Sequence, residues 1–299
     1  MRSTDLSFEA RLEAFPAQCA DVAPSRRIGY RDCGKAAAAR AAALPLVLLH
    51  GIGSGAASWL QQLEALGTTR RVLAWDAPGY GISTPVERAS PHAADYAEAL
   101  RGWLDALGIE RCVLVGHSLG AIIAGSFAAA HPQRVAGVAL LSPAGGYGAA
   151  SEAVRVQKRD ARLAMLAELG PQGLAAQRSA NMLSTTASEA AREWVRWNMA
   201  RIVPGGYAQA THLLANADLA SDVARYRHEV TDDRKIGVAV GTEDRITPPD
   251  ACERIAQAAN VPLQLIAGAG HAGYVEAPET YNTLIATFYE TCEQQETQA

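Results

Sequence analysis

The chain has 299 residues, which is enough for one large α/β domain or two small domains with a substantial core. Apolar residues make up 49% of it and charged residues 19%, a composition typical of folded globular proteins and unlike that of disordered chains. The 27 Lys and Arg residues against 31 Asp and Glu residues give a net charge of −4, which argues against nucleic acid or an anionic membrane surface as a partner.

The cysteines and the N-terminal segment bear on the cellular compartment. The cysteines are scattered and form no CxxC pair or Cys/His cluster, so we expect reduced thiols and no metal site. They are Cys19, Cys33, Cys112, Cys252 and Cys292. Residues 1–15 include acidic side chains where a signal peptide needs apolar ones, and no apolar run approaches the roughly 20 residues that span a bilayer. The sequence therefore predicts a cytoplasmic protein without a membrane partner.

Short apolar runs alternate with helical stretches along most of the chain. The runs predict an edge strand at 28–33 and buried strands at 46–50, 71–76, 112–116, 135–142, 235–241 and 263–268. Helices are expected at about 58–66, 92–107, 119–130, 249–258 and 278–291. This alternation predicts an α/β fold with a mostly parallel sheet flanked by helices, and ligands then bind beyond the carboxyl ends of the strands.

One long segment interrupts the alternation. Residues 147–227 contain helical spacing and no buried-strand pattern, and the glycine-rich stretch 142–150 marks their start. An all-helical insertion between two core strands is typical of a lid. We therefore expect a core domain formed by 1–146 and 228–299, and a helical cap formed by 147–227.

The stretch GHSLG at 116–120 points to a nucleophile. It follows the apolar run CVLVG and precedes a helical segment, and a reactive serine sits on such a strand-to-helix turn, where small flanking residues relieve crowding. A glycine-flanked tight turn without chemistry is the competing interpretation. The strand before it and the helix after it favour Ser118 as the nucleophile.

A serine nucleophile needs a base, and the base needs an orienting group. His271 follows the run that ends at Ala267, and Asp244 follows the strand that ends near Gly241. The chain order Ser118, Asp244, His271 is the order described for this architecture. We therefore predict these three as the catalytic residues.

An oxyanion needs two fixed N–H donors. The backbone N–H of Leu119, directly after the nucleophile, is the first candidate, and that of Ile52, in the glycine-rich loop after the strand at 46–50, is the second. His50 either braces this loop or, together with Gly51, contacts the substrate.

The motifs together resemble the α/β-hydrolase superfamily. The matching stretches are LLHGIGSGAASW, DAPGYGIS, GHSLGA, GTEDRITP and GHAGYVEAPE, in that order. The resemblance implies an eight-stranded, mostly parallel sheet with the cap inserted after the sixth strand. HGIGS and residues 204–219 are similar to the 3-oxoadipate enol-lactonase and carboxylesterase-like branch. The hydrolases that cleave C–C bonds of meta-cleavage products usually carry Gly-Pro-Gly where this chain has Gly53-Ser54-Gly55.

The predicted activity is hydrolysis of a small carboxylic ester or lactone through an acyl-enzyme, without a metal or organic cofactor. In the cap, Trp194, Trp197, Met182 and Met199 would line an acyl pocket or form the core of the cap. Arg155, Arg159 and Arg162 recur at helical spacing and would meet a substrate carboxylate or form a solvated helix face.

Two functional alternatives stay open at this point. The chain could be a C–C bond hydrolase, or a protein that uses the same fold to sense a small molecule with little or no turnover. Nothing in the sequence decides between a monomer and a homodimer.

Overall fold

A central eight-stranded sheet organises the computed structural model, which describes residues 6–34, 43–230 and 235–298. The strands are β1 (Gln18–Ala23), β2 (Arg26–Cys33), β3 (Leu46–Leu49), β4 (Val72–Trp75), β5 (Cys112–His117), β6 (Val135–Leu141), β7 (Ile236–Gly241) and β8 (Leu263–Ile266). Their order across the sheet is β1-β2-β4-β3-β5-β6-β7-β8. The pairs β1–β2 and β2–β4 are antiparallel, and all pairs from β4 to β8 are parallel.

The central strands are the continuous apolar runs of the sequence. β3, β4, β5 and β6 are buried at every position, as expected for strands covered on both faces. β1 differs, because its residues alternate between partly buried and exposed, and it has no apolar run from which it could be predicted. The structure confirms the expected sheet and identifies β1 as the strand that the apolar runs did not reveal. The prediction that the strand at 263–268 is buried was wrong, because β8 lies at the edge of the sheet and its central residues are exposed.

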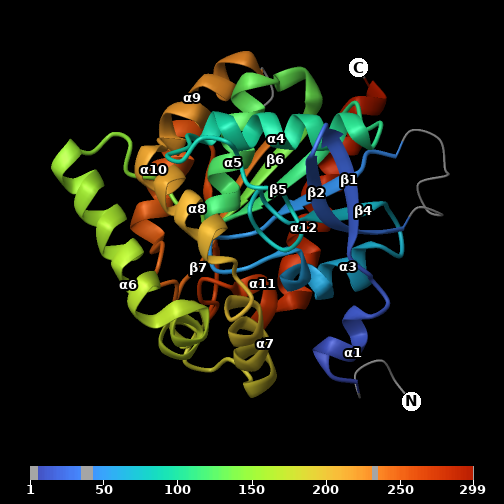
Figure 1. The fold of residues 1–299 in the computed structure, drawn as a ribbon. Coiled ribbons are helices and arrows are strands. Elements are labelled where there is room, and N and C mark those ends of the chain that lie inside the picture. The colour runs from blue at the N-terminus through green and yellow to red at the C-terminus, as the bar shows by residue number, and fades with distance from the viewer. Residues whose placement is uncertain (1–5, 35–42, 231–234, 299) are drawn as a thin grey trace.

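Helices cover both faces of this sheet (Figure 1). Alternate strand residues enter two hydrophobic clusters: Val47 and Leu49 pack in one, and Leu46 and Leu48 pack in the other. The first cluster includes side chains of α4 (Ala93–Ala106), α5 (Leu119–Ala130) and α10 (Pro249–Ala259). The second includes side chains of α1 (Phe8–Leu12), α3 (Leu60–Leu66), α11 (Gly273–Glu276) and α12 (Pro278–Gln298). The helices predicted between the strands are confirmed, and α12 extends beyond its predicted end.

Four α-helices of the described residues lie between β6 and β7. They are α6 (Glu152–Arg178), α7 (Glu189–Met199), α8 (Pro204–Asn216) and α9 (Leu219–Glu229), with the 3₁₀ helix η4 (Ser179–Met182) after α6. The insertion therefore follows the sixth strand, and α6 forms the outer edge of the molecule (Figure 1). α6 is broken at Gly170, which has a φ of 60° and a ψ of −179° and is followed by Pro171.

The last inserted helix belongs to the layer that covers the sheet. Leu219 and Val223 of α9 are fully buried in the same cluster as α5 and α10. The division of the chain into a core and a cap at 147–227 stays a prediction.

None of the helices in the described part of the chain is both long and apolar enough to cross a bilayer.

Candidate active site

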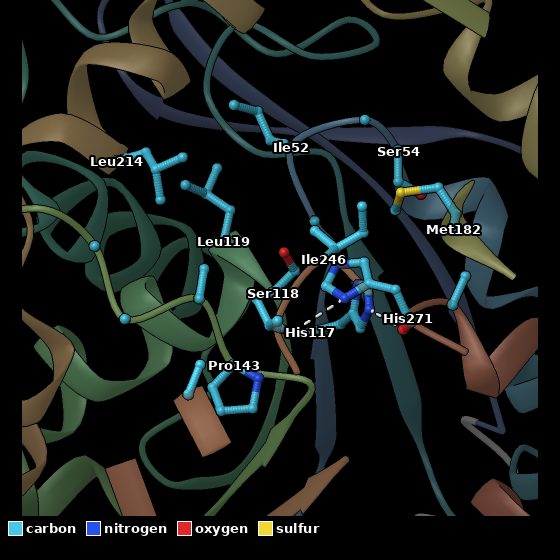
Figure 2. A pocket seen from close by; sticks show the side chains of 18 of the residues that line it. Ile52, Ser54, His117, Ser118, Leu119, Pro143, Met182, Leu214, Ile246 and His271 are labelled. Atoms are coloured by element: carbon cyan, nitrogen blue, oxygen red, sulfur yellow. Dashed lines mark hydrogen bonds between the residues drawn. The ribbon is translucent and has the colours of Figure 1, made fainter. Parts of the chain in front are cut away.

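Ser118 lies in a tight turn between β5 and α5. Its φ of 53° and ψ of −113° place a non-glycine residue in a sparsely populated backbone region, which is a strained conformation. A Cβ atom at Gly116 would lie 2.4 Å from the carbonyl oxygen of Gly120, and one at Gly120 would lie 2.1 Å from that of Leu49. The turn therefore requires glycine at both positions, and it holds the Ser118 side chain in the cavity shown in Figure 2.

The backbone of Ser118 is fixed by the end of β6. Its N–H donates to the Leu141 carbonyl at 3.0 Å, and its carbonyl accepts the N–H of Ala144 at 3.2 Å. Its hydroxyl makes no hydrogen bond with any described residue. The backbone of Ser118 is thus fixed, while its hydroxyl has no partner among the described residues.

Asp244, in the loop after β7, is an ionised and buried carboxylate. It accepts hydrogen bonds from His271 Nδ1 at 2.9 Å and from the N–H groups of Ile246 and Thr247 at 2.8 and 2.9 Å. Burial alone would raise its pKa, but the hydrogen bond and charge of His271, with these two N–H groups, lower the pKa to about 2. Asp244 is therefore negatively charged at neutral pH and can only accept hydrogen bonds.

Asp244 orients the imidazole of His271, which lies in the loop after β8. Since Nδ1–H donates to the carboxylate, Nε2 is the nitrogen that can take a proton. The Thr247 hydroxyl lies 2.9 Å from Asp244 Oδ2 and 3.1 Å from His271 Nδ1, so it contacts both members of the Asp244–His271 pair. Ser118 and His271 both line the cavity, although no hydrogen bond joins them. Such catalytic hydrogen bonds are often long in enzymes without substrate.

His117 supports the backbone of His271. Its Nε2–H donates to the His271 carbonyl at 2.8 Å, and its ring lies 4.7 Å from that of His271 and 4.8 Å from that of Tyr274. Burial, and then repulsion by His271, lower the pKa of His117 to about 3. The side chain is therefore neutral at physiological pH. Sequence reasoning assigned it no role, because its partner lies 154 positions away.

Acid is expected to destabilise the protein through His117. The unfolded histidine binds a proton near its ordinary pKa of 6.5 and the folded one only near 3, so between these values the unfolded state holds more protons. Stability should fall as the pH drops through this window, by about 1 kcal/mol per pH unit for one proton. Urea unfolding at pH 7, 6 and 5 would measure the slope.

His117→Gln is the matched variant for this measurement. It keeps an N–H donor but cannot titrate, so the pH slope should decrease by about one proton. His228→Gln, which replaces an exposed histidine, serves as the control. Equal slopes in the wild-type and His117→Gln proteins would contradict the prediction.

Two backbone N–H groups beside Ser118 have no acceptor in the described chain. They belong to Leu119, the first residue of α5, and to Ile52, in the loop after β3. The Leu119 N–H lies at the start of a helix, where the dipole favours negative charge. Both side chains line the same cavity as Ser118 (Figure 2). These groups fit the oxyanion donors predicted from the sequence.

The loop at 50–55 holds the Ile52 N–H in place. His50 Nδ1–H and the N–H of Ser54 both donate to the Gly51 carbonyl, at 2.8 and 3.2 Å. Since the peptide is planar and trans, fixing the Gly51 carbonyl also fixes the direction of the Ile52 N–H. The Tyr80 hydroxyl then donates to the Ile52 carbonyl at 2.8 Å.

His50 is a structural residue of this loop. Its Nε2 accepts the N–H of Ala77 at 3.0 Å, so the proton is on Nδ1. Burial lowers the pKa of His50 and keeps it neutral. Gly51 lines the cavity and the fully buried His50 does not. Of the two substrate contacts predicted here, the structure thus places only Gly51 at the cavity.

The cavity has a volume of about 540 Å³ and is mostly apolar. Val195 and Met199 of α7 and Leu174 of α6 form part of its wall. Arg162 and Arg178, on the two sides of the break in α6, also reach it. No carboxylate in the described residues lies within 4.0 Å of either guanidinium.

The tryptophans of α7 face away from this cavity. Trp194 and Trp197 stack on each other with ring centroids 4.6 Å apart, and Trp194 stacks on Phe8. Neither is among the cavity-lining residues, whereas Met182 and Met199 are. The placement does not support the predicted substrate contacts of Trp194 and Trp197, because their rings pack against the N-terminal helix.

A family described as "alpha/beta hydrolase fold" matches residues 45–278. The chain belongs to the α/β-hydrolase fold family. The resemblance noted in the sequence is thereby confirmed.

The α/β hydrolase is also similar to individual proteins over most of its length. It is 30% identical to a 2-hydroxy-6-oxononadienedioate/2-hydroxy-6-oxononatrienedioate hydrolase of Pseudomonas putida, over 88% of this chain and 91% of the relative. Among solved structures, it is similar to a thermophilic esterase from Thermogutta terrifontis, with a TM-score of 0.76, 22% identity and coverage of 93% and 99%. The enol-lactonase from Burkholderia xenovorans LB400 gives a TM-score of 0.75, 23% identity and coverage of 91% and 99%. The two structures support the fold of the α/β hydrolase, and all three proteins are hydrolases by name.

Proposed function

We propose that this α/β hydrolase cleaves a carboxylic ester or a lactone through an acyl-enzyme on Ser118. The proposal rests on the groups that surround the Ser118 hydroxyl. It sits on a strained turn beside two N–H groups that have no acceptor among the described residues, and it shares a cavity with a histidine held by a buried carboxylate. This is the set of groups that acyl transfer requires.

In the proposed reaction, Ser118 Oγ attacks the carbonyl carbon while its proton passes to His271 Nε2. The N–H groups of Leu119 and Ile52 receive the oxyanion, and Asp244 stabilises the imidazolium. The carbonyl re-forms, the C–O bond breaks, and the leaving oxygen takes the proton from His271. Water then attacks the acyl-enzyme by the same route and releases the acid.

Cleavage of a C–C bond is the second candidate, favoured by the Pseudomonas putida relative, whose name gives dioates as its substrates. Ser118 would then attack a ketone, and the leaving carbon would take the proton. The two cavity arginines add physical support, because Arg162 and Arg178 have no carboxylate partner in the described chain and are suited to bind a substrate carboxylate.

A fluorophosphonate probe tests the proposed nucleophile. The wild-type protein should be labelled at Ser118, and folded Ser118→Ala protein should not be labelled. Ser126→Ala, at a buried serine of α5 outside the cavity, is a matched control that should still be labelled. Folded wild-type protein that resists the probe would instead support the small-molecule sensor and refute the hydrolase.

A substrate panel then separates the two reactions. p-Nitrophenyl esters and an enol-lactone report C–O cleavage, and a vinylogous diketone acid reports C–C cleavage. In either case the double variant Arg162→Gln/Arg178→Gln should raise KM for carboxylate-bearing substrates by about tenfold, as expected for one lost charged hydrogen bond, and leave KM for uncharged esters within about twofold. Turnover of the diketone without ester or lactone turnover would overturn the main proposal.

A further inference from the structure

The N-terminal helix reaches the wall of the cavity through a column of stacked side chains. The ring of Phe8 in α1 lies 4.9 Å from that of Trp194 at an interplanar angle of 11°. Trp194 in turn stacks on Trp197, and the guanidinium of Arg201 lies 3.6 Å over the Trp197 ring. We call Phe8, Trp194, Trp197 and Arg201 the aromatic column.

A polar contact joins the same two helices. The carboxylate of Glu9 accepts the indole N–H of Trp197 and lies 3.7 Å from Arg201. Both partners are partly or largely exposed, so this contact adds specificity rather than much stability. It orients α1 along the face of α7 that carries the tryptophans.

α1 is itself anchored to the body of the protein. Arg11 forms a two-point ion pair with Glu64 of α3, through Nε at 2.8 Å and through Nη2. Leu12 is buried in the hydrophobic cluster that contains Leu60 and Leu63 of α3. Because α3 packs on the sheet, α1 is fixed relative to the sheet. The contact of α1 with α7 can therefore fix the position of α7 as well.

The other side of α7 faces the candidate site. Val195, Asn198 and Met199 line the cavity. The methyl group of Met199 lies 3.1 Å from the position of a Cβ atom at Gly53, in the loop that carries the Ile52 N–H. α7 therefore lies between α1, which stacks on it through Phe8, and the loop at 50–55, which we call the oxyanion loop.

We propose that Phe8 is a positioning residue that sets the width of the cavity by holding α7 against the oxyanion loop. It acts through Trp194 and does not touch the substrate. Its removal would leave the Trp194 face of α7 without its stacking partner and allow Val195 and Met199 to move away from Ser118. The kcat/KM for esters with large acyl groups would then rise relative to that for esters with small acyl groups. The inference rests on the proposed acyl-transfer activity.

The test compares Phe8→Ala, Phe8→Tyr and Leu6→Ala in the full-length protein. Leu6 is an apolar residue of the same segment, 43% exposed and outside the aromatic column, and is the matched control. kcat and KM are measured for p-nitrophenyl acetate, butyrate and octanoate. Phe8→Ala should raise the octanoate-to-acetate ratio of kcat/KM about fivefold, the size expected for one aromatic pair, and Phe8→Tyr should restore the wild-type ratio.

A second measurement reads α7 directly. Hydrogen exchange of the amides at 194–199 should become faster in Phe8→Ala and stay unchanged in Leu6→Ala. A loss of thermal stability with an unchanged chain-length ratio and unchanged exchange in α7 would overturn the inference. Wild-type protein that the fluorophosphonate probe does not label would refute the proposed function instead, and the exchange measurement would still decide whether Phe8 holds α7.

Discussion

Replacing Asp244 with asparagine is expected to lower kcat about 10⁴-fold, the size of effect seen when the orienting acid of a serine triad is changed in this way. The amide matches the carboxylate in size, but it carries no charge and presents an N–H₂ group. His271 Nδ1 then loses its charged acceptor, and the ring is no longer held in the tautomer that leaves Nε2 free. The measurement is kcat on the best ester of the panel, with circular dichroism to show that the variant is folded.

Glu243→Gln is the matched control for this prediction. Glu243 precedes Asp244 in the same loop, but its carboxylate contacts Thr185 at 3.3 and 3.4 Å and lies outside the cavity lining. Its replacement should change kcat by less than about twofold, as expected for a surface substitution. If Glu243→Gln lost as much activity as Asp244→Asn, the role given to Asp244 would be wrong.

Replacing Gly120 with alanine should destabilise the fold by about 3 kcal/mol or more. The added methyl group would lie 2.1 Å from the Leu49 carbonyl oxygen and 2.9 Å from that of His50, and both atoms belong to backbone that cannot rotate away. α5 would have to move off β3 and take Ser118 with it. Chemical denaturation measures the loss, and the oxyanion loop that follows β3 should be disturbed together with it.

Gly205→Ala is the opposite case in a helix of the same protein. Gly205 lies in the first turn of α8, and a Cβ atom there would meet nothing within 4 Å. Alanine restricts the unfolded chain more than glycine does, so stability should rise by about 0.5 to 1 kcal/mol. If both substitutions destabilised the protein to a similar extent, the short distance between a Cβ atom at Gly120 and the Leu49 carbonyl oxygen would not be the reason that the turn requires glycine.

The sheet and the candidate triad were predictable because both follow from local pattern. Ser118 and Asp244 each follow a buried apolar strand, His271 follows the largely exposed strand β8, and the carboxyl ends of parallel strands meet at one edge. β1 was not predictable in this way. It is held by antiparallel pairing with β2, and its alternating half-exposed residues leave no continuous apolar signal.

What could not be predicted depends on contacts between distant segments. Helical spacing put Trp194 and Trp197 on one face of α7, but it could not show that the face is covered by Phe8 and not by substrate. The same limit applies to the arginines. Arg178 reaches the cavity from beyond the break at Gly170, so no single helical repeat relates it to Arg162.

The positions of the candidate residues along the chain also set when the site can be completed. Ser118 and its turn belong to β5 and α5, but the base beside them lies on the loop after β8, and His271 is 154 residues beyond His117. During synthesis on the ribosome, the turn that carries Ser118 is therefore made long before His271. In the proposed mechanism, Ser118 would therefore lack its base during most of synthesis and would become reactive only when one of the last loops of the chain is in place.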